Sequence, residues 1–275
     1  MPTSLEISDR LVRDPNGGMA RILEIMRRLR DPVTGCPWDI EQTFASIAPY
    51  TLEEAHEVAD AIARQAWAEL PAELGDLLFQ VVYHAQMAQD GGLFGFDDVV
   101  RTISDKMVDR HPHVFGSESR DKSAAQQTAD WEKIKAAERG PARVLDGVAL
   151  GLPALTRAVK LQKRAARVGF DWPSTDEVLA KMREEIEELV EARRDLTAAE
   201  VNEEFGDLMF VMANLARHLE IDPEAALRAA NAKFTRRFGA IEDWLAQAGK
   251  RCEDSDLAEM DALWNRAKAQ EKKSS

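Results

Sequence analysis

Hydrophobic residues recur along the chain at the three- and four-residue spacing of one helix face. One run in each half shows this spacing clearly: Met19, Ile22, Met26 and Leu29, then Met182, Ile186, Leu189 and Val190. This period is typical of amphipathic α-helices, whereas β-strands would need long alternating patterns, which the sequence lacks. The pattern therefore predicts an all-α fold.

An acidic pattern occurs twice along these predicted helices. The first copy comprises Glu53, Glu54, Glu57, Glu73 and Asp76, and the second comprises Glu184, Glu185, Glu188, Glu204 and Asp207. Each acid of the second copy follows its counterpart by 131 positions. Since chance rarely repeats five acids at one displacement, the sequence predicts two tandem helical bundles built on one plan.

The segment between the copies interrupts the helical period. It is polar from residue 116 to residue 127 and then contains Gly140-Pro141 and Gly151-Leu152-Pro153, which favour turns. We place the join near residue 145, which gives domains 1–145 and 146–275. Each domain is expected to hold an opening helix, a turn with a core tryptophan (Trp38 or Trp172), an EExxE helix, an ExxD helix and later basic helices.

Charge and cysteine content limit the classes of function. The 275 residues include 36 Lys and Arg against 49 Asp and Glu, a net charge of −13 that disfavours binding to nucleic acid or an anionic membrane. Only Cys36 and Cys252 occur, which argues against a disulfide framework or a cysteine metal site. Acids near the N-terminus and the lack of an 18-residue apolar run lead us to expect a cytoplasmic protein.

The spacing within each acidic copy places its carboxylates on shared helix faces. Glu185 with Glu188, and Glu204 with Asp207, form ridges because residues three and four apart are neighbours on a helix. Both ridges border an apolar stripe, which runs through Met182, Ile186 and Leu189 on one helix and Leu208, Met212 and Leu215 on the other. Packing of these stripes would bring the carboxylates of the two helices together.

A solvated acidic face with ion pairs such as Lys181 to Glu185 is the alternative to a metal site. Like charges one turn apart cost about 0.2 to 0.5 kcal/mol per pair, so a repeated acidic cluster beside an apolar stripe favours a bound cation. Carboxylate oxygens select Mg²⁺ or Mn²⁺, and four or five of them exceed what one ion neutralises, which predicts two ions per site. Such centres hydrolyse phosphate esters or anhydrides.

The sequence disfavours a di-iron centre and a phosphate-binding loop. A di-iron bundle normally needs two ExxH steps, and only Glu53 with His56 makes one, because Glu187 stands at the second position. No GxxxxGK[ST] phosphate loop occurs either. Phosphate would then be bound by side chains such as Lys233 and Arg237, one turn apart, although an ordinary surface pair has the same spacing.

Trp264 and Lys268 repeat the one-turn spacing. The indole ring could stack on a base while the ammonium group of Lys268 meets a phosphate. The alternative is a tryptophan packed under the C-terminal helix.

Together these residues resemble the MazG family of nucleoside triphosphate pyrophosphohydrolases, in the all-α NTP pyrophosphatase group. The resemblance extends from about Gly18 onward and is carried by Gly35-Cys36-Pro37-Trp38-Asp39, Tyr50-Thr51-Leu52-Glu53-Glu54, the ELGD segment, Arg110-His111-Pro112-His113-Val114-Phe115 and Val168-Gly169-Phe170-Asp171-Trp172. It implies a homodimer with two MazG-like domains per chain. It also implies Mg²⁺-dependent cleavage of (d)NTPs between the α and β phosphates, giving a nucleoside monophosphate and pyrophosphate.

The resemblance implies a role for each candidate residue, with the second copy as the main catalytic one. That copy has Lys181 where the first has Tyr50, and Glu203 where the first has Ala72. The expected metal ligands are Glu185, Glu188, Glu204 and Asp207, with Glu54, Glu57, Glu73 and Asp76 in the first copy. The expected nucleotide-binding residues are Lys181, Lys233, Arg237, Trp264 and Lys268. Water activation is assigned to Glu184 or Glu203.

Two alternatives to a general NTP pyrophosphohydrolase stay open. A non-catalytic sensor of nucleotide or metal could use the same acids. A pyrophosphatase specialised for dUTP or phosphoribosyl-ATP would also share them. Base preference depends on packed side chains that lie far apart in the sequence.

Overall fold

A computed structural model describes the chain except for residues 1–3, 125, 129, 132–133, 135–142 and 275. The chain forms two compact units, Met1–Glu138 and Arg139–Ser275, and each is treated by itself below. Every regular element in the described residues is a helix, which confirms the all-α prediction. None of these helices is both long and apolar enough to cross a membrane.

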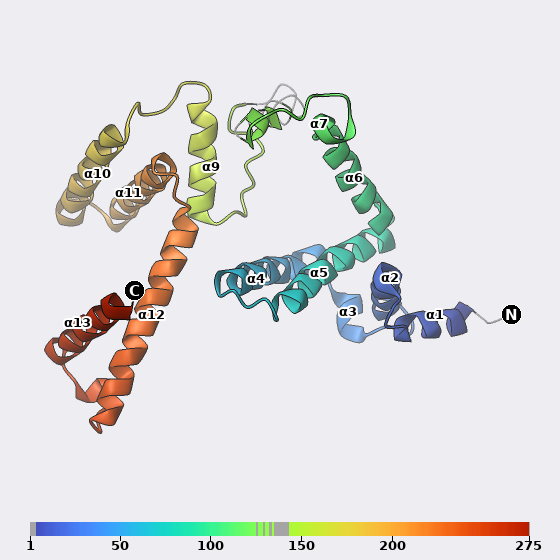
Figure 1. Cartoon of the computed structure of the whole chain (residues 1–275), viewed down its shortest axis with the longest axis horizontal. Coiled ribbons are helices and arrows are strands. Elements are labelled where there is room, and N and C mark those ends of the chain that lie inside the picture. Colours follow the sequence, from blue (N-terminus) through green and yellow to red (C-terminus); the bar gives the residue numbers. More distant parts are fainter. Residues whose placement is uncertain (1–3, 125, 129, 132–133, 135–142, 275) are drawn as a thin grey trace. The chain divides into compact units, whose positions relative to one another are not determined.

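The first unit is organised around a long helical hairpin (Figure 1). The hairpin consists of α4 (Phe44–Ala63) and α5 (Leu70–Asp90), and α5 also packs against α2 and α6. The other helices are α1 (Ser4–Arg13), α2 (Gly18–Leu29), α3 (Pro37–Glu41), α6 (Phe96–Asp109) and α7 (Pro112–Phe115).

Local sequence signals fix the ends of the hairpin helices. Thr43 caps α4, because its side chain accepts a hydrogen bond from the backbone N–H of Ser46 at 3.2 Å. Pro71 occupies the first turn of α5, where its missing N–H is harmless. These caps set where each helix begins and therefore which of its residues face the other helix.

The core of the first unit lies where α2, α4 and α5 meet. Its buried side chains are Met26, Ile47, Val82, Tyr83 and Met87, with Ile22, Leu23, Phe79 and Phe96 packed around them. The Tyr83 hydroxyl donates a hydrogen bond to the Asp39 carbonyl oxygen at 2.9 Å, so its polar end is satisfied.

Trp38 is not buried in this core. It lies in the short helix α3 rather than in a turn, and its side chain is 52% exposed. The largest fully buried side chains of this unit include Tyr83 and Met26. That expectation is therefore wrong for Trp38, whereas Trp172 does lie in a connecting segment, between α9 and α10.

The second unit repeats the hairpin with α10 (Thr175–Asp195) and α11 (Ala198–His218), which lie side by side (Figure 1). Helix α9 (Ala154–Ala166) packs against α11 and α12. A second hairpin pairs α12 (Pro223–Gln247) with α13 (Leu257–Ser274), joined through the 3₁₀ turn η1 (Cys252–Asp254). Thr197 and Glu200 form a reciprocal capping box that starts α11.

The apolar stripe of the second hairpin is covered only in part within the described residues. Val178 and Val211 are buried, but Ile186 and Met212 remain 46% and 47% exposed. The expectation that Ile186 and Met212 pack between α10 and α11 is therefore wrong. Helix periodicity identifies an apolar face, but it does not say which part of that face a neighbouring helix covers.

Candidate active site

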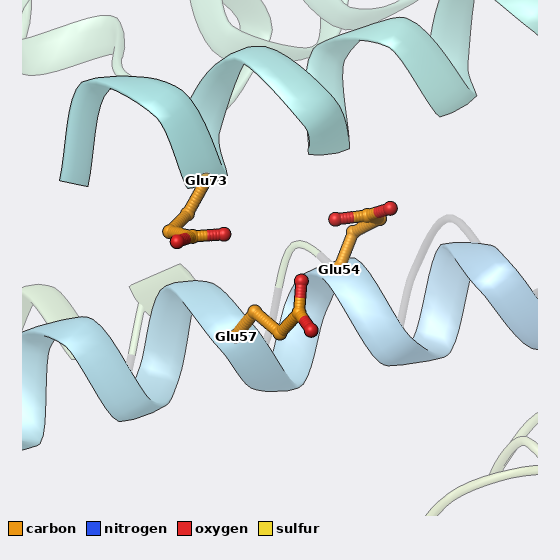
Figure 2. Close-up of side chains that lie close together, drawn as sticks. All are labelled: Glu54, Glu57 and Glu73. Carbon is orange, nitrogen blue, oxygen red and sulfur yellow. The ribbon is translucent and has the colours of Figure 1, made fainter. Parts of the chain in front are cut away.

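Each hairpin brings three carboxylates to a single point. The groups are Glu54, Glu57 and Glu73 in the first unit and Glu185, Glu188 and Glu204 in the second, and within each group one oxygen per residue lies within 4.8 Å of the others. In Figure 2, Glu73 of α5 points toward Glu54 and Glu57 of α4 across the space between the helices. Since hard oxygen donors converge in both groups, their chemistry fits Mg²⁺ or Mn²⁺.

The second group already contains a side-chain cation. The ammonium nitrogen Nζ of Lys181 lies 2.7 Å from Glu184, 2.8 Å from Glu185 and 3.9 Å from Glu188. Glu185 is only 5% exposed, and a buried carboxylate without a compensating charge is costly. The Lys181 ammonium group thus compensates the charge of the buried Glu185 carboxylate in the folded structure.

The ion pair named in the sequence analysis as the alternative to a metal site is therefore present. However, Glu185 and Glu188 also converge with Glu204 of the opposite helix, which a merely solvated acidic face would not require. The pairing of Lys181 and the convergence of the acids coexist in one site.

Carboxylate repulsion perturbs both groups. Burial, and then the charges of Glu188 and Asp207, raise the pKa of Glu204 above its ordinary value. Burial, and then the charges of Asp76 and Glu57, raise the pKa of Glu54. Asp207 and Asp76 thus act on their groups electrostatically from outside the closest three carboxylates. A bound cation would relieve this repulsion.

The two units differ at the position of the internal cation. Tyr50 stands in the first unit where Lys181 stands in the second, and its ring packs edge-on against Trp38 with the centroids 6.4 Å apart. The largest effects on the Glu54 carboxyl group are burial and neighbouring acids, with no cation among them. The first group is therefore an acidic cluster without a matching lysine.

Four of the five expected nucleotide-binding residues, all except Lys181 of α10, lie on the α12–α13 hairpin. The Arg237 guanidinium lies 5.4 Å from the Trp264 ring centroid. The ring centroids of Phe234 and Trp264 are also 5.4 Å apart. Lys233 and Lys268 are exposed on the same two helices. The three carboxylates converge between α10 and α11, whereas Arg237 and Trp264 contact each other on α12 and α13.

Glu271 is a residue that the sequence analysis missed. Its carboxylate accepts hydrogen bonds from Arg237 Nε and Nη2 at 2.8 and 2.7 Å, and from Arg236 Nε at 2.8 Å. The partners lie 34 and 35 positions apart in the sequence, on different helices, so no local spacing signals the contact. The Arg237 edge that would bind a phosphate is thus engaged by a carboxylate.

The two candidates for water activation differ in their surroundings. Glu184 is paired with Lys181, whereas Glu203 is exposed. The Glu203 charge adds to the effect of burial in raising the pKa of the neighbouring Glu204.

Trp131 and Lys135 have the same spacing in the first unit as Trp264 and Lys268 in the second. Trp131 donates a hydrogen bond to the Arg110 carbonyl oxygen at 2.9 Å, and Lys135 lies outside the described residues.

Comparison with known proteins agrees with this geometry. Residues 42–115 match the family described as MazG nucleotide pyrophosphohydrolase domain, and residues 152–234 match the family described as phosphoribosyl-ATP pyrophosphohydrolase. Each match includes one acidic cluster.

Full-length relatives are also similar. The chain is 52% identical over 256 residues to the nucleoside triphosphate pyrophosphohydrolase of Escherichia coli (strain K12), covering 91% of this chain and 97% of that protein. It is 41% identical over 249 residues to the nucleoside triphosphate pyrophosphohydrolase/pyrophosphatase MazG of Thermotoga maritima, covering 90% and 94%. With its tandem helical hairpins and duplicated acidic clusters, the chain belongs to the MazG family of nucleoside triphosphate pyrophosphohydrolases, a family of enzymes.

Proposed function

We propose that this chain hydrolyses nucleoside triphosphates, including deoxynucleotides, between the α and β phosphates, with the α10–α11 cluster as the main site. The observation that carries the proposal is the convergence of Glu185 and Glu188 of α10 with Glu204 of α11. Converging carboxylates suit a divalent cation that carries a polyphosphate. The products would be a nucleoside monophosphate and pyrophosphate.

Glu185, Glu188, Glu204 and Asp207 would hold Mg²⁺, with two ions per site in view of the number of acids. When bound, Mg²⁺ supplies charge neutralisation for the phosphates and lowers the pKa of a coordinated water. The same chemistry is open to Glu54, Glu57, Glu73 and Asp76 in the first unit.

The chain's own side chains would perform the remaining steps. Lys181, Lys233, Arg237 and Lys268 bind phosphate oxygens, and the Trp264 ring stacks on the base. Glu184 or Glu203 accepts the proton of the attacking water. The water oxygen bonds to the α phosphorus as the bond from that phosphorus to the bridging oxygen breaks, and the negative charge leaves on pyrophosphate.

We further propose a homodimer. The second hairpin leaves Ile186, Val190, Phe205 and Met212 about half exposed on α10 and α11. Large apolar side chains gathered on one hairpin favour burial against another protein surface. A second copy of the same hairpin would complete a four-helix arrangement around the acidic cluster and has a self-complementary face to offer.

A second candidate substrate is phosphoribosyl-ATP. It is favoured by the match of residues 152–234, which include the main cluster, to the phosphoribosyl-ATP pyrophosphohydrolase family. This compound has the same type of α–β phosphoanhydride, so the acidic cluster alone does not separate it from the nucleoside triphosphates.

Chromatographic identification of products tests the function. The purified chain is incubated with each NTP and dNTP, with dUTP and with phosphoribosyl-ATP, in Mg²⁺ or in EDTA. The proposal predicts monophosphate and pyrophosphate from several triphosphates in Mg²⁺ only. Turnover of phosphoribosyl-ATP or dUTP alone would establish a specialised enzyme, and saturable nucleotide binding without any product would establish a sensor.

A further inference from the structure

We propose that Lys181 is a built-in counterion that occupies the acidic cluster of the second unit in the absence of metal and passes to the substrate phosphates when metal binds. The inference rests on the proposed function of this cluster as a metal-dependent site. Its consequence is that the second unit binds metal and nucleotide in a coupled manner, whereas the first unit binds metal independently of nucleotide.

The Lys181 side chain lies among the acids of α10. Its ammonium group contacts Glu184 and Glu185 at hydrogen-bonding distance and lies 3.9 Å from Glu188. Two of these acids, Glu185 and Glu188, belong to the group of three with converging oxygens. The ammonium group therefore neutralises part of the negative charge of the carboxylates that a metal ion would use.

The Lys181 ammonium group and a divalent cation would repel each other if both lay at the second cluster. A divalent cation at this group would lie a few ångströms from the ammonium charge, and like charges at such distances repel by several kcal/mol where water is partly excluded. Glu185 is buried, so the repulsion is not fully screened there. Lys181 must therefore leave the carboxylates as the metal binds.

The triphosphate offers the displaced ammonium group a new partner. Lys181 is 29% exposed and sits on a flexible four-carbon side chain, so its ammonium group has room to move without any change in α10. A metal-bound polyphosphate brings several negative oxygens to the cluster. Metal and nucleotide together thus restore the charge balance that either one alone would upset, which gives positive coupling between the two ligands.

The first unit has no lysine at the position that matches Lys181. Tyr50 replaces Lys181, is neutral, and packs against Trp38. Glu54, Glu57 and Glu73 therefore repel one another without an internal cation. The first cluster gains more from a metal ion when no nucleotide is present.

Metal titration of the nucleotide-free full-length chain tests the inference. Glu54→Gln weakens the first cluster, so that Mn²⁺ binding measured by calorimetry or electron paramagnetic resonance reports the second. In this background, Lys181→Met is expected to tighten Mn²⁺ binding about tenfold. It is also expected to reduce the extra tightening that a nonhydrolysable nucleotide produces. Arg183→Met removes the same charge from an exposed position of the same helix and is expected to leave Mn²⁺ affinity unchanged.

The reciprocal variant gives an independent readout, and it serves where Lys181→Met fails to fold. In a Glu185→Gln background, which leaves the first cluster intact, Tyr50→Lys is expected to weaken Mn²⁺ binding about tenfold. Unchanged or weaker Mn²⁺ binding in a folded Lys181→Met chain, or unchanged binding in Tyr50→Lys, would overturn the inference. Failure of the proposed function is a different result, namely that the wild-type chain releases no pyrophosphate from any triphosphate.

Discussion

The Arg237 guanidinium of α12 lies over the face of the Trp264 ring of α13, 5.4 Å from its centroid, and so links the two helices of the hairpin. The contact places the guanidinium group that we propose to bind phosphate beside the aromatic ring that we propose to stack on the base. The Trp264 ring also packs against Phe234 and is half-buried, and its stacking on a base stays a prediction.

Replacing Trp264 by leucine is expected to raise the KM for nucleotide about tenfold with a smaller effect on kcat, because base stacking on an aromatic ring contributes about 1 to 3 kcal/mol. Steady-state kinetics measures the change. Trp244→Leu is the matched control, since it removes a second cation–π contact of the same hairpin, with Arg266 at 4.2 Å. An equal rise in KM in both variants would mean that Trp264 acts through hairpin stability alone.

Glu271 is expected to compete with phosphate for Arg237. Because its carboxylate binds Nε and Nη2 of that guanidinium, nucleotide must displace it before the same edge can bind a phosphate. Glu271→Gln is therefore expected to tighten binding of a nonhydrolysable nucleotide several-fold in calorimetry. Weaker binding would show instead that Glu271 orients Arg237 for the substrate.

Half-exposed apolar side chains of the second hairpin are expected to be buried in a homodimer. Met212→Glu places a charge on this face and should convert the dimer to a folded monomer, as followed by sedimentation equilibrium and circular dichroism. Leu257→Glu is the control, because Leu257 is 80% exposed at the start of α13 and away from this face. A chain that stays dimeric with Met212→Glu would place the interface elsewhere.

Stability should depend on pH through Glu24. The hydrogen bond from Arg27, and secondarily that from the Ser8 hydroxyl, outweigh partial burial and lower the pKa of Glu24 from 4.5 to about 2. A carboxyl group with a lowered folded-state pKa stabilises the fold above pH 4.5, and this stabilisation is lost as pH falls toward 2.

Glu24→Gln should therefore cost about 2 kcal/mol at pH 7, and the difference from wild type should shrink as pH falls from 4.5 to 2. Thermal unfolding of both chains over this pH range measures it. A difference in stability that stays constant with pH would show that the Glu24 carboxylate has no special role in the contact between α1 and α2.

Much of the architecture could be predicted because its signals are local. The helical period, the cap at Thr197 and the proline at position 71 act within a few residues, and the repeat displacement pairs Glu54 with Glu185. Contacts between distant positions could not be predicted in this way. The engagement of Arg237 by Glu271 depends on how α12 and α13 pack, and one-face periodicity did not reveal that Met212 stays exposed.

Comparison of Glu185→Gln with Glu54→Gln for pyrophosphate release tests the central claim most directly. Each change removes one charge from the matching position of its cluster while retaining the size of the side chain. With the α10–α11 cluster as the main site, Glu185→Gln is expected to lower kcat/KM by at least about a hundredfold, because a proposed metal ligand is lost. Glu54→Gln is expected to retain most of the activity. Undiminished pyrophosphate release by a folded Glu185→Gln chain would contradict it.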